Sequence, residues 1–162
     1  MKRTTALRAP LLCWDIYGMY LSEQAKNFNK QTEIAFLNDC KEKFGWTLDI
    51  EELLIENKFE ALILTDANQD IKWVNKGFSV MTGYPAKFAV GKKPNFLQGE
   101  KSSPETRKVM RTQIKSEQHF REEIINYKKD GKPYKCEIAI YPLKDESNKT
   151  THLLALENAL AL

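Results

Sequence analysis

The chain has 162 residues, of which 42% are hydrophobic and 29% are charged, and its formal net charge is +3. This length suits one domain with an accessory segment and leaves no room for a second large catalytic module. The sequence contains no run of about 18 apolar residues, the length needed to cross a bilayer. The basic residues form no cluster interleaved with aromatic side chains, so both membrane and nucleic-acid partners are disfavoured.

Three cysteines, Cys13, Cys40 and Cys136, lie far apart in the chain. An odd number without paired spacing argues against a disulfide framework or a zinc site and favours a reducing compartment. The basic and apolar N-terminal stretch is interrupted by Asp15 and has no small-residue cleavage site. We therefore expect this stretch to be retained and the protein to be cytoplasmic.

Residues 10–57 are predicted to form three helices and no strand. Two apolar stripes at spacings of three and four residues indicate the first two helices, and Gly45 ends the second as a C-cap. Asp49 starts the third, with Glu52 completing a capping box. The two stripes are Trp14, Tyr17, Leu21, Ala25 and Phe28, then Ile34, Leu37, Cys40 and Phe44.

The first helix has a second apolar side, formed by Leu12, Ile16, Met19 and Tyr20. Packing against a single neighbour would leave this side in water, so the helix requires two neighbours. Residues 1–57 are thus either a cap folded on their own domain or a dimerisation segment. We favour a homodimer, and the residues expected to form its interface are Trp14, Tyr17, Leu21 and Phe28.

Strand and turn patterns begin at Glu60. EALILTD and IKWVN are separated by a tight turn, which predicts an antiparallel hairpin. Short helical segments follow, punctuated at Gly83 and Pro85, and Ser102 or Ser103 can cap a longer helix that starts near Pro104 and runs to about residue 117.

Three further strands are predicted after that helix. FREEIINY and PYKCEIAIYPL flank an Asp130-Gly131 turn, and THLLALE follows the polar turn DESNK. The resulting order of elements predicts an α+β domain, in which a five-stranded antiparallel sheet is covered on one face by short helices.

Three separated motifs resemble the PAS family. WVNKGFSVMTGY matches the family's strand end and helix, NYKKDGKPY resembles its hairpin with a D-G turn, and GKKPNFLQG contains the F-L-Q-G of its LOV branch. Because several motifs occur in the right order, the resemblance implies a PAS fold over residues 58–158, with residues 1–57 as a helical extension and 159–162 as a tail.

The LOV resemblance implies a flavin site, but this chain departs from it. Gln98 and Asn126 match flavin-holding positions, whereas Pro94 replaces the reactive cysteine, Asn95 an arginine and Glu157 a glutamine. Proline has no nucleophilic atom, so no cysteinyl adduct can form at position 94. Lys93 and Cys136 replace two further flavin-holding asparagines, so a flavin (FMN) is not the expected cofactor.

The function we predict is a non-catalytic PAS sensory module that binds a small ligand or a partner protein and signals to an unidentified downstream protein. A non-covalent flavin photoreceptor and a ligand-free dimerisation scaffold remain alternatives. We expect the ligand cavity to be formed by aromatic, polar and apolar side chains on the helices and strands. They are Phe78, Tyr84, Phe96, Gln98, Asn126, Cys136 and Ile138.

The remaining candidates are weaker. Cys136 is expected to be a core residue rather than a nucleophile. His119 and His152 have no cysteine or carboxylate at ligand spacing and are interpreted as surface or turn residues, not as metal ligands. Arg107 and Arg111 belong to a basic stripe on the long helix, which we interpret as a solvated face.

Overall fold

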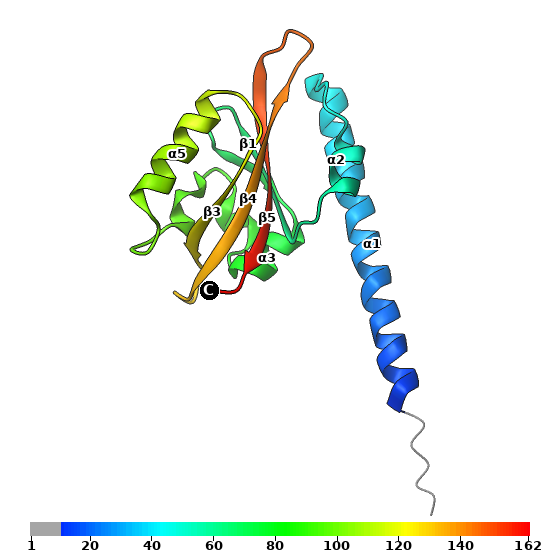
Figure 1. The fold of residues 1–162 in the computed structure, drawn as a ribbon. Helices are drawn as coiled ribbons and strands as arrows, with labels where there is room; N and C mark the ends of the chain where they lie inside the picture. The colour runs from blue at the N-terminus through cyan, green and yellow to red at the C-terminus, as the bar shows by residue number, and fades with distance from the viewer. Residues whose placement is uncertain (1–10) are drawn as a thin grey trace, which may run out of the picture.

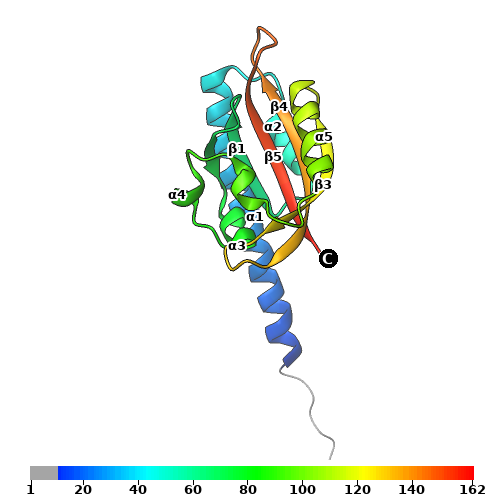
Figure 2. The ribbon, with the colours of Figure 1, turned by 90° about the vertical axis from the view of Figure 1, so that its left-hand side faces the viewer.

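The computed structural model describes residues 11–162, except the side chains of residues 11–15 and 26–28. Its centre is a five-stranded antiparallel sheet in the order β2-β1-β5-β4-β3, with helices on both faces (Figures 1 and 2). The predicted α+β fold is therefore confirmed. The strands are β1 (Ala61–Asp66), β2 (Ile71–Val74), β3 (Phe120–Tyr127), β4 (Pro133–Lys144) and β5 (Thr150–Leu160).

Local turn chemistry sets the strand pairing. The Asp66 carboxylate accepts hydrogen bonds from the backbone N–H groups of Asn68 and Asp70 and closes the β1–β2 hairpin. Between β3 and β4, Gly131 has a φ of 84°, which glycine adopts without strain. β5 continues through residues 159 and 160, which the sequence had assigned to a tail.

Four short helical segments cover the inner face of the sheet. They are α3 (Lys76–Thr82), α4 (Ala86–Ala89), the 3-10 helix η1 (Pro94–Leu97) and α5 (Pro104–Lys115). Ser103 caps α5, because its side chain accepts a hydrogen bond from the Thr106 N–H, and Pro104 occupies the first helical position as predicted. This layer and the sheet enclose one hydrophobic core.

Asn75 joins three parts of the fold. Its side-chain oxygen accepts hydrogen bonds from the backbone N–H groups of Phe78 and Leu62, each at 2.9 Å, and its amide donates to the Glu33 carboxylate at 2.7 Å. One side chain therefore caps α3, holds β1 and contacts the N-terminal extension.

We expect Asn75→Ala to lower the free energy of unfolding by roughly 1–3 kcal/mol, because it leaves two buried backbone donors without partners. Urea unfolding followed by circular dichroism measures the change. Asn68→Ala, at an exposed turn position, is the matched control and should change stability by less than about 0.5 kcal/mol. Equal stability of the two variants would contradict the assigned role of Asn75.

The two helices predicted at the N-terminus are one continuous helix, α1 (Leu11–Phe44). The predicted break was wrong because residues 29–33 contain neither glycine nor proline, so nothing interrupts the backbone hydrogen bonds between the two apolar stripes. Gly45, with a φ of 67°, ends α1 as predicted. The predicted Asp49 cap of α2 (Ile50–Glu56) is confirmed, since its carboxylate accepts from the Glu52 N–H at 2.9 Å.

The second half of α1 and all of α2 pack on the outer face of the sheet and form a second core there. Its fully buried members include Leu37, Ile50 and Leu54, which meet Leu62 and Leu154 of the central strands. This part of the extension is therefore an integral layer of the domain, visible beside the sheet in Figure 1.

His152 is buried against this outer core, so its interpretation as a surface or turn residue was wrong. It is 8% exposed, and its ring lies 4.4 Å from that of Phe44 and 5.1 Å from that of Trp46 between centroids. Strand alternation along β5 directs it beneath the end of α1. Burial lowers its pKa and so favours the neutral imidazole.

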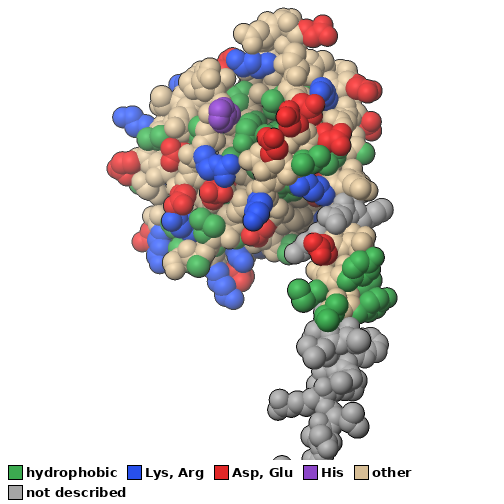
Figure 3. Space-filling model, turned by 45° about the vertical axis from the view of Figure 1, so that its right-hand side comes forward, with side chains coloured by type: hydrophobic (Ala, Val, Ile, Leu, Met, Phe, Trp, Pro, Cys, Tyr) green, Lys and Arg blue, Asp and Glu red, His purple; other side chains and the backbone are tan. Residues whose placement is uncertain are grey.

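The first half of α1 projects beyond the sheet (Figure 1). Ile16, Tyr17, Met19, Tyr20 and Leu21 are between 48% and 73% exposed, and Figure 3 shows hydrophobic side chains gathered on this projecting part. The side chains of Trp14 and Phe28 lie outside the described residues. The described residues here present an apolar surface that their own domain does not cover.

Candidate functional site

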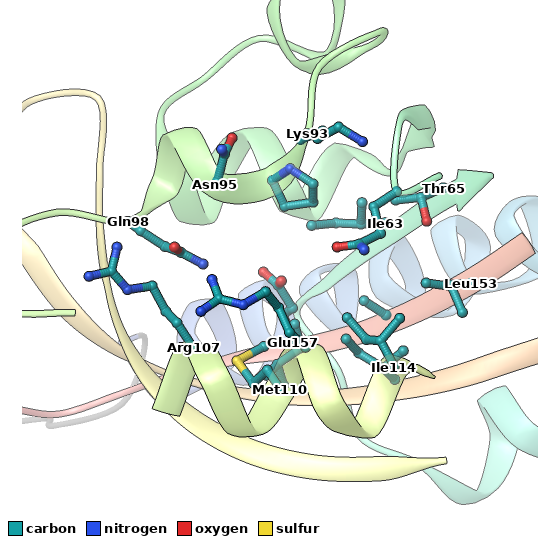
Figure 4. A pocket seen from close by; sticks show the side chains of 16 residues that line it. Ile63, Thr65, Lys93, Asn95, Gln98, Arg107, Met110, Ile114, Leu153 and Glu157 are labelled. Carbon is teal, nitrogen blue, oxygen red and sulfur yellow. The ribbon is translucent and has the colours of Figure 1, made fainter. Parts of the chain in front are cut away.

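A cavity of about 330 Å³ lies between α5, the segment around η1 and the inner face of the sheet (Figure 4). This volume is within the range of small-molecule sites. Its apolar walls are Ile63, Met110, Ile114, Ile138, Ile140 and Leu153. Its polar lining includes Thr65, Gln69, Lys93, Asn95, Gln98, Arg107, Arg111 and Glu157.

The FLQG segment places Gln98 in this cavity. A side chain at Gly99 would put its Cβ 2.5 Å from the Tyr127 ring, so only glycine lets the loop approach β3 so closely. The Ser102 hydroxyl accepts a hydrogen bond from the Gly99 N–H and donates to the Ile125 carbonyl. Gln98 then pairs with Asn126 in an isolated antiparallel bridge.

The structure separates the seven predicted cavity residues into two groups. Gln98 and Ile138 line the cavity, and Asn126 is buried beside Gln98. Phe78 and Cys136 are fully buried members of the inner core, and the lining of the cavity does not include them.

Tyr84 and Phe96 form an aromatic cluster with Phe88. The ring centroids are 4.9 Å apart for Tyr84 and Phe88, and 5.1 Å apart for Tyr84 and Phe96. These rings pack against one another rather than opening a space. The cavity lies instead under α5, which the sequence did not assign to the site.

Positive charge surrounds the cavity. Arg107 and Arg111 come from α5, one turn apart, and Lys93 comes from the residue before η1. Lys93 forms a salt bridge with Asp70, in which its Nζ atom lies 3.6 Å from the Oδ1 atom. Neither arginine forms a salt bridge with a described residue. Arg107 is half-buried, so the interpretation of a solvated face was wrong for it, whereas Arg111 is exposed as that interpretation expected. Met110 and Ile114, at helical spacing from them, were the available signal for a cavity-facing side.

Glu157 is the buried charge of the site. Its side chain is 1% exposed, it interacts with Cys136, and its Oε2 atom has no hydrogen-bond partner among the described residues. Burial raises the pKa of its carboxyl to about 7. Protonated and ionised forms of Glu157 therefore coexist near neutral pH.

Comparison with known proteins identifies the family of this chain. The model of the PAS domain family matches residues 60–158. The chain belongs to the PAS family. It is 32% identical to Phototropin-1A of Oryza sativa subsp. japonica over 101 residues and 31% identical to Blue-light-activated histidine kinase 2 of Erythrobacter litoralis over 100 residues. Each alignment covers 60% of this chain, but only 11% and 29% of those relatives.

Solved structures agree with the LOV-like branch of the PAS family. The LOV domain of the Erythrobacter litoralis EL346 blue-light activated histidine kinase superposes with a TM-score of 0.61 at 28% identity. That alignment covers 65% of this chain and 99% of the LOV domain. The predicted PAS fold and LOV-like resemblance are thus confirmed.

The PAS cavity suits a non-covalently held flavin in part. Gln98 offers an amide group to a heterocycle, and Arg107, Arg111 and Lys93 offer cations to a phosphate. The amide of Asn126 interacts instead with Tyr134 and Cys136. The chemistry that a bound flavin supplies is light absorption and electron transfer. Pro94 lines the cavity, no cysteine is among the lining residues, and Cys136 is fully buried, with burial raising its pKa. The residues therefore do not fit a covalent adduct.

Other site classes find no support in the part of the chain that the structure describes. No group of three or more His, Cys, Asp or Glu side chains there could hold a metal ion. Among the same residues, no helix is both long enough and apolar enough to span a bilayer.

Proposed function

We propose that this PAS protein is a non-catalytic sensory module that binds a small ligand in the cavity under α5 and dimerises through α1. The observation that carries the proposal is the cavity itself, which combines apolar walls, a buried unpaired carboxyl oxygen and cations at its rim. Such a lining suits an aromatic or heterocyclic ligand with an anionic substituent.

The central strands supply a route for the signal. On β5, Ala155 and Glu157 line the cavity, while Leu154 and Leu156 belong to the outer core beneath α1 and α2. A ligand that displaces β5 therefore also alters the packing of the extension. It can shift this equilibrium only if it binds the two arrangements with different affinity. The proposed receiver of the signal is a separate downstream protein in the cytoplasm.

Mass spectrometry of the small molecules released when the purified protein is denatured tests the ligand proposal. We expect one anionic heterocycle at near-equal molar amount. Arg107→Ala should weaken its rebinding by roughly tenfold, because a charge-assisted hydrogen bond is lost. Lys108→Ala, on an exposed position of the same helix, should not change it. A protein that releases nothing and rebinds nothing would instead be a dimerisation scaffold.

A non-covalent flavin photoreceptor is the second candidate, favoured by the position of Gln98 in the cavity and by the similarity to LOV domains. It predicts a yellow protein whose FMN is released on denaturation. Because no cysteine lines the cavity, blue light should produce no sulfur adduct in the absorption spectrum. A colourless preparation that fails to bind added FMN would eliminate this candidate.

The dimer is proposed to form through the projecting half of α1. Replacing both Tyr17 and Leu21 with alanine should raise the dissociation constant of the dimer by roughly tenfold or more, because both side chains would lose apolar contact area. Sedimentation measured over a range of concentrations gives this constant. A Ser22→Ala and Gln24→Ala double variant changes neighbouring exposed positions and serves as the control. A monomeric parent protein would contradict the proposal.

A further inference from the structure

The position of Glu157 at the cavity is fixed by the pairing of its strand with both neighbouring strands. It is on β5, the central strand of the sheet, and pairs with Ala61 on β1 and Ile138 on β4. Since backbone pairing holds it from both sides, its side chain stays on the inner face, where it lines the cavity (Figure 4). The carboxyl is therefore a fixed feature of the site.

The surroundings of Glu157 leave one carboxyl oxygen without a donor among the described residues. Cys136 on β4 interacts with the carboxyl, and the nearby Tyr134 hydroxyl interacts with Asn126. From α5 and the segment before η1, Arg107, Arg111 and Lys93 line the same cavity but form no salt bridge with Glu157. On the remaining sides, Gln98 lines the cavity, and Asn126 interacts with Tyr134 and Cys136. The charge of Glu60 raises the pKa of both Tyr134 and Cys136.

An unpaired buried carboxyl oxygen is costly, and a ligand that donates a hydrogen bond to it would remove the cost. A ligand that presents only acceptor atoms there would meet repulsion from the ionised carboxylate. In its ionised form, the carboxyl thus both attracts one class of ligand and rejects the other.

We propose that Glu157 is the specificity-determining residue of the cavity and selects heterocycles that donate an N–H group at their buried end. The inference rests on the proposed ligand-binding function and narrows it to a ligand class. The apolar walls fit a planar ring system, and the rim cations fit an anionic substituent on the ligand's outer end.

A matched pair of probes tests this selection. Indole-3-acetate carries a ring N–H, and benzofuran-3-acetate has the same shape with a ring oxygen in its place. Ligand-observed NMR titration at pH 8 should show that the parent protein binds the indole roughly tenfold or more tightly than the benzofuran. Glu157→Met, which keeps the length of the side chain but removes the acceptor, should bring the ratio close to one.

The pH dependence of this ratio separates selection by Glu157 from a merely structural role. Because an N–H donor favours the ionised carboxyl, the indole affinity should fall between pH 8 and pH 6, by up to about tenfold per pH unit below the pKa. Benzofuran-3-acetate has the same carboxylate and controls for effects on the rim cations. Glu157→Gln keeps an acceptor oxygen, so it should retain part of the preference but lose its pH dependence.

Two results would overturn the inference. Equal affinity for the two probes would show that Glu157 does not select, even if a released ligand confirms the proposed function. Failure of both probes to bind, with each variant folded by circular dichroism, would also overturn it, and the released-ligand measurement would then decide the proposed function alone.

Discussion

Leu54→Ala should lower the free energy of unfolding by about 2–5 kcal/mol, the range for removing a large buried aliphatic side chain. Leu54 lies on α2, is fully buried and belongs to the core on the outer face of the sheet. If the extension is an integral layer of the domain, this change should destabilise the whole protein in a single transition. Urea unfolding followed by both tryptophan fluorescence and circular dichroism measures it.

Ile55→Ala provides the control, because Ile55 is the next residue on the same helix and is 60% exposed. It should change the free energy of unfolding by less than about 0.5 kcal/mol. If Leu54→Ala left the unfolding of the sheet unchanged, the extension would be an independent appendage and the proposed route from β5 to α1 would fail.

Glu157→Gln should remove about 3 kcal/mol of pH dependence from the stability. The pKa of Glu157 is about 7 in the folded protein against an ordinary value of 4.5. The folded state therefore binds the proton more tightly than the unfolded chain, and the parent protein should lose stability as pH rises from about 4.5 to 7. The full loss, about 3 kcal/mol, is reached above pH 7.

Urea unfolding at pH 5 and pH 8 tests this sign. We subtract the unfolding free energy of the parent from that of Glu157→Gln at each pH. This difference should be about 2–3 kcal/mol higher at pH 8 than at pH 5. Glu146→Gln changes an exposed glutamate and should leave the pH profile as in the parent. A variant with an unaltered profile would show that Glu157 is ionised in the folded protein without penalty.

Sequence patterns predicted most of the fold because the signals are local. Asp49 caps α2, Gly45 ends α1 and Asp130-Gly131 turns the chain between β3 and β4, and each needs only a few neighbouring residues to specify it. Strand alternation likewise placed Ile138 on the inner face. The sequence predicted two helices where α1 is one, because apolar stripes show which faces of a helix are buried but not where the helix ends. Whether the helix continues depends on the polar residues between the two stripes.

The cavity was harder to predict, since its lining comes from segments far apart in the chain. Gln98 and Ile138 were expected in it, but Met110 and Arg107 of α5 were not. A half-buried arginine and a solvated one have the same sequence spacing, so only the packing of α5 over the sheet distinguishes them. Tyr84 and Phe96 were wrongly expected to line the cavity, because the sequence does not show whether aromatic rings line a cavity or pack against one another. In the structure they pack against one another and against Phe88.

The continuity of α1 has a mechanical consequence. A straight helix of 34 residues is about 51 Å long. Its second half is anchored on the outer core, so its first half acts as a lever arm that amplifies motion at the anchor. A tilt of about 5° at the anchor would move the far end of this arm, about 25 Å away, by roughly 2 Å, which exceeds the rise of one helical residue. A rearrangement at the outer core that barely changes the sheet would thus displace the N-terminal end of α1 enough to affect a protein bound there.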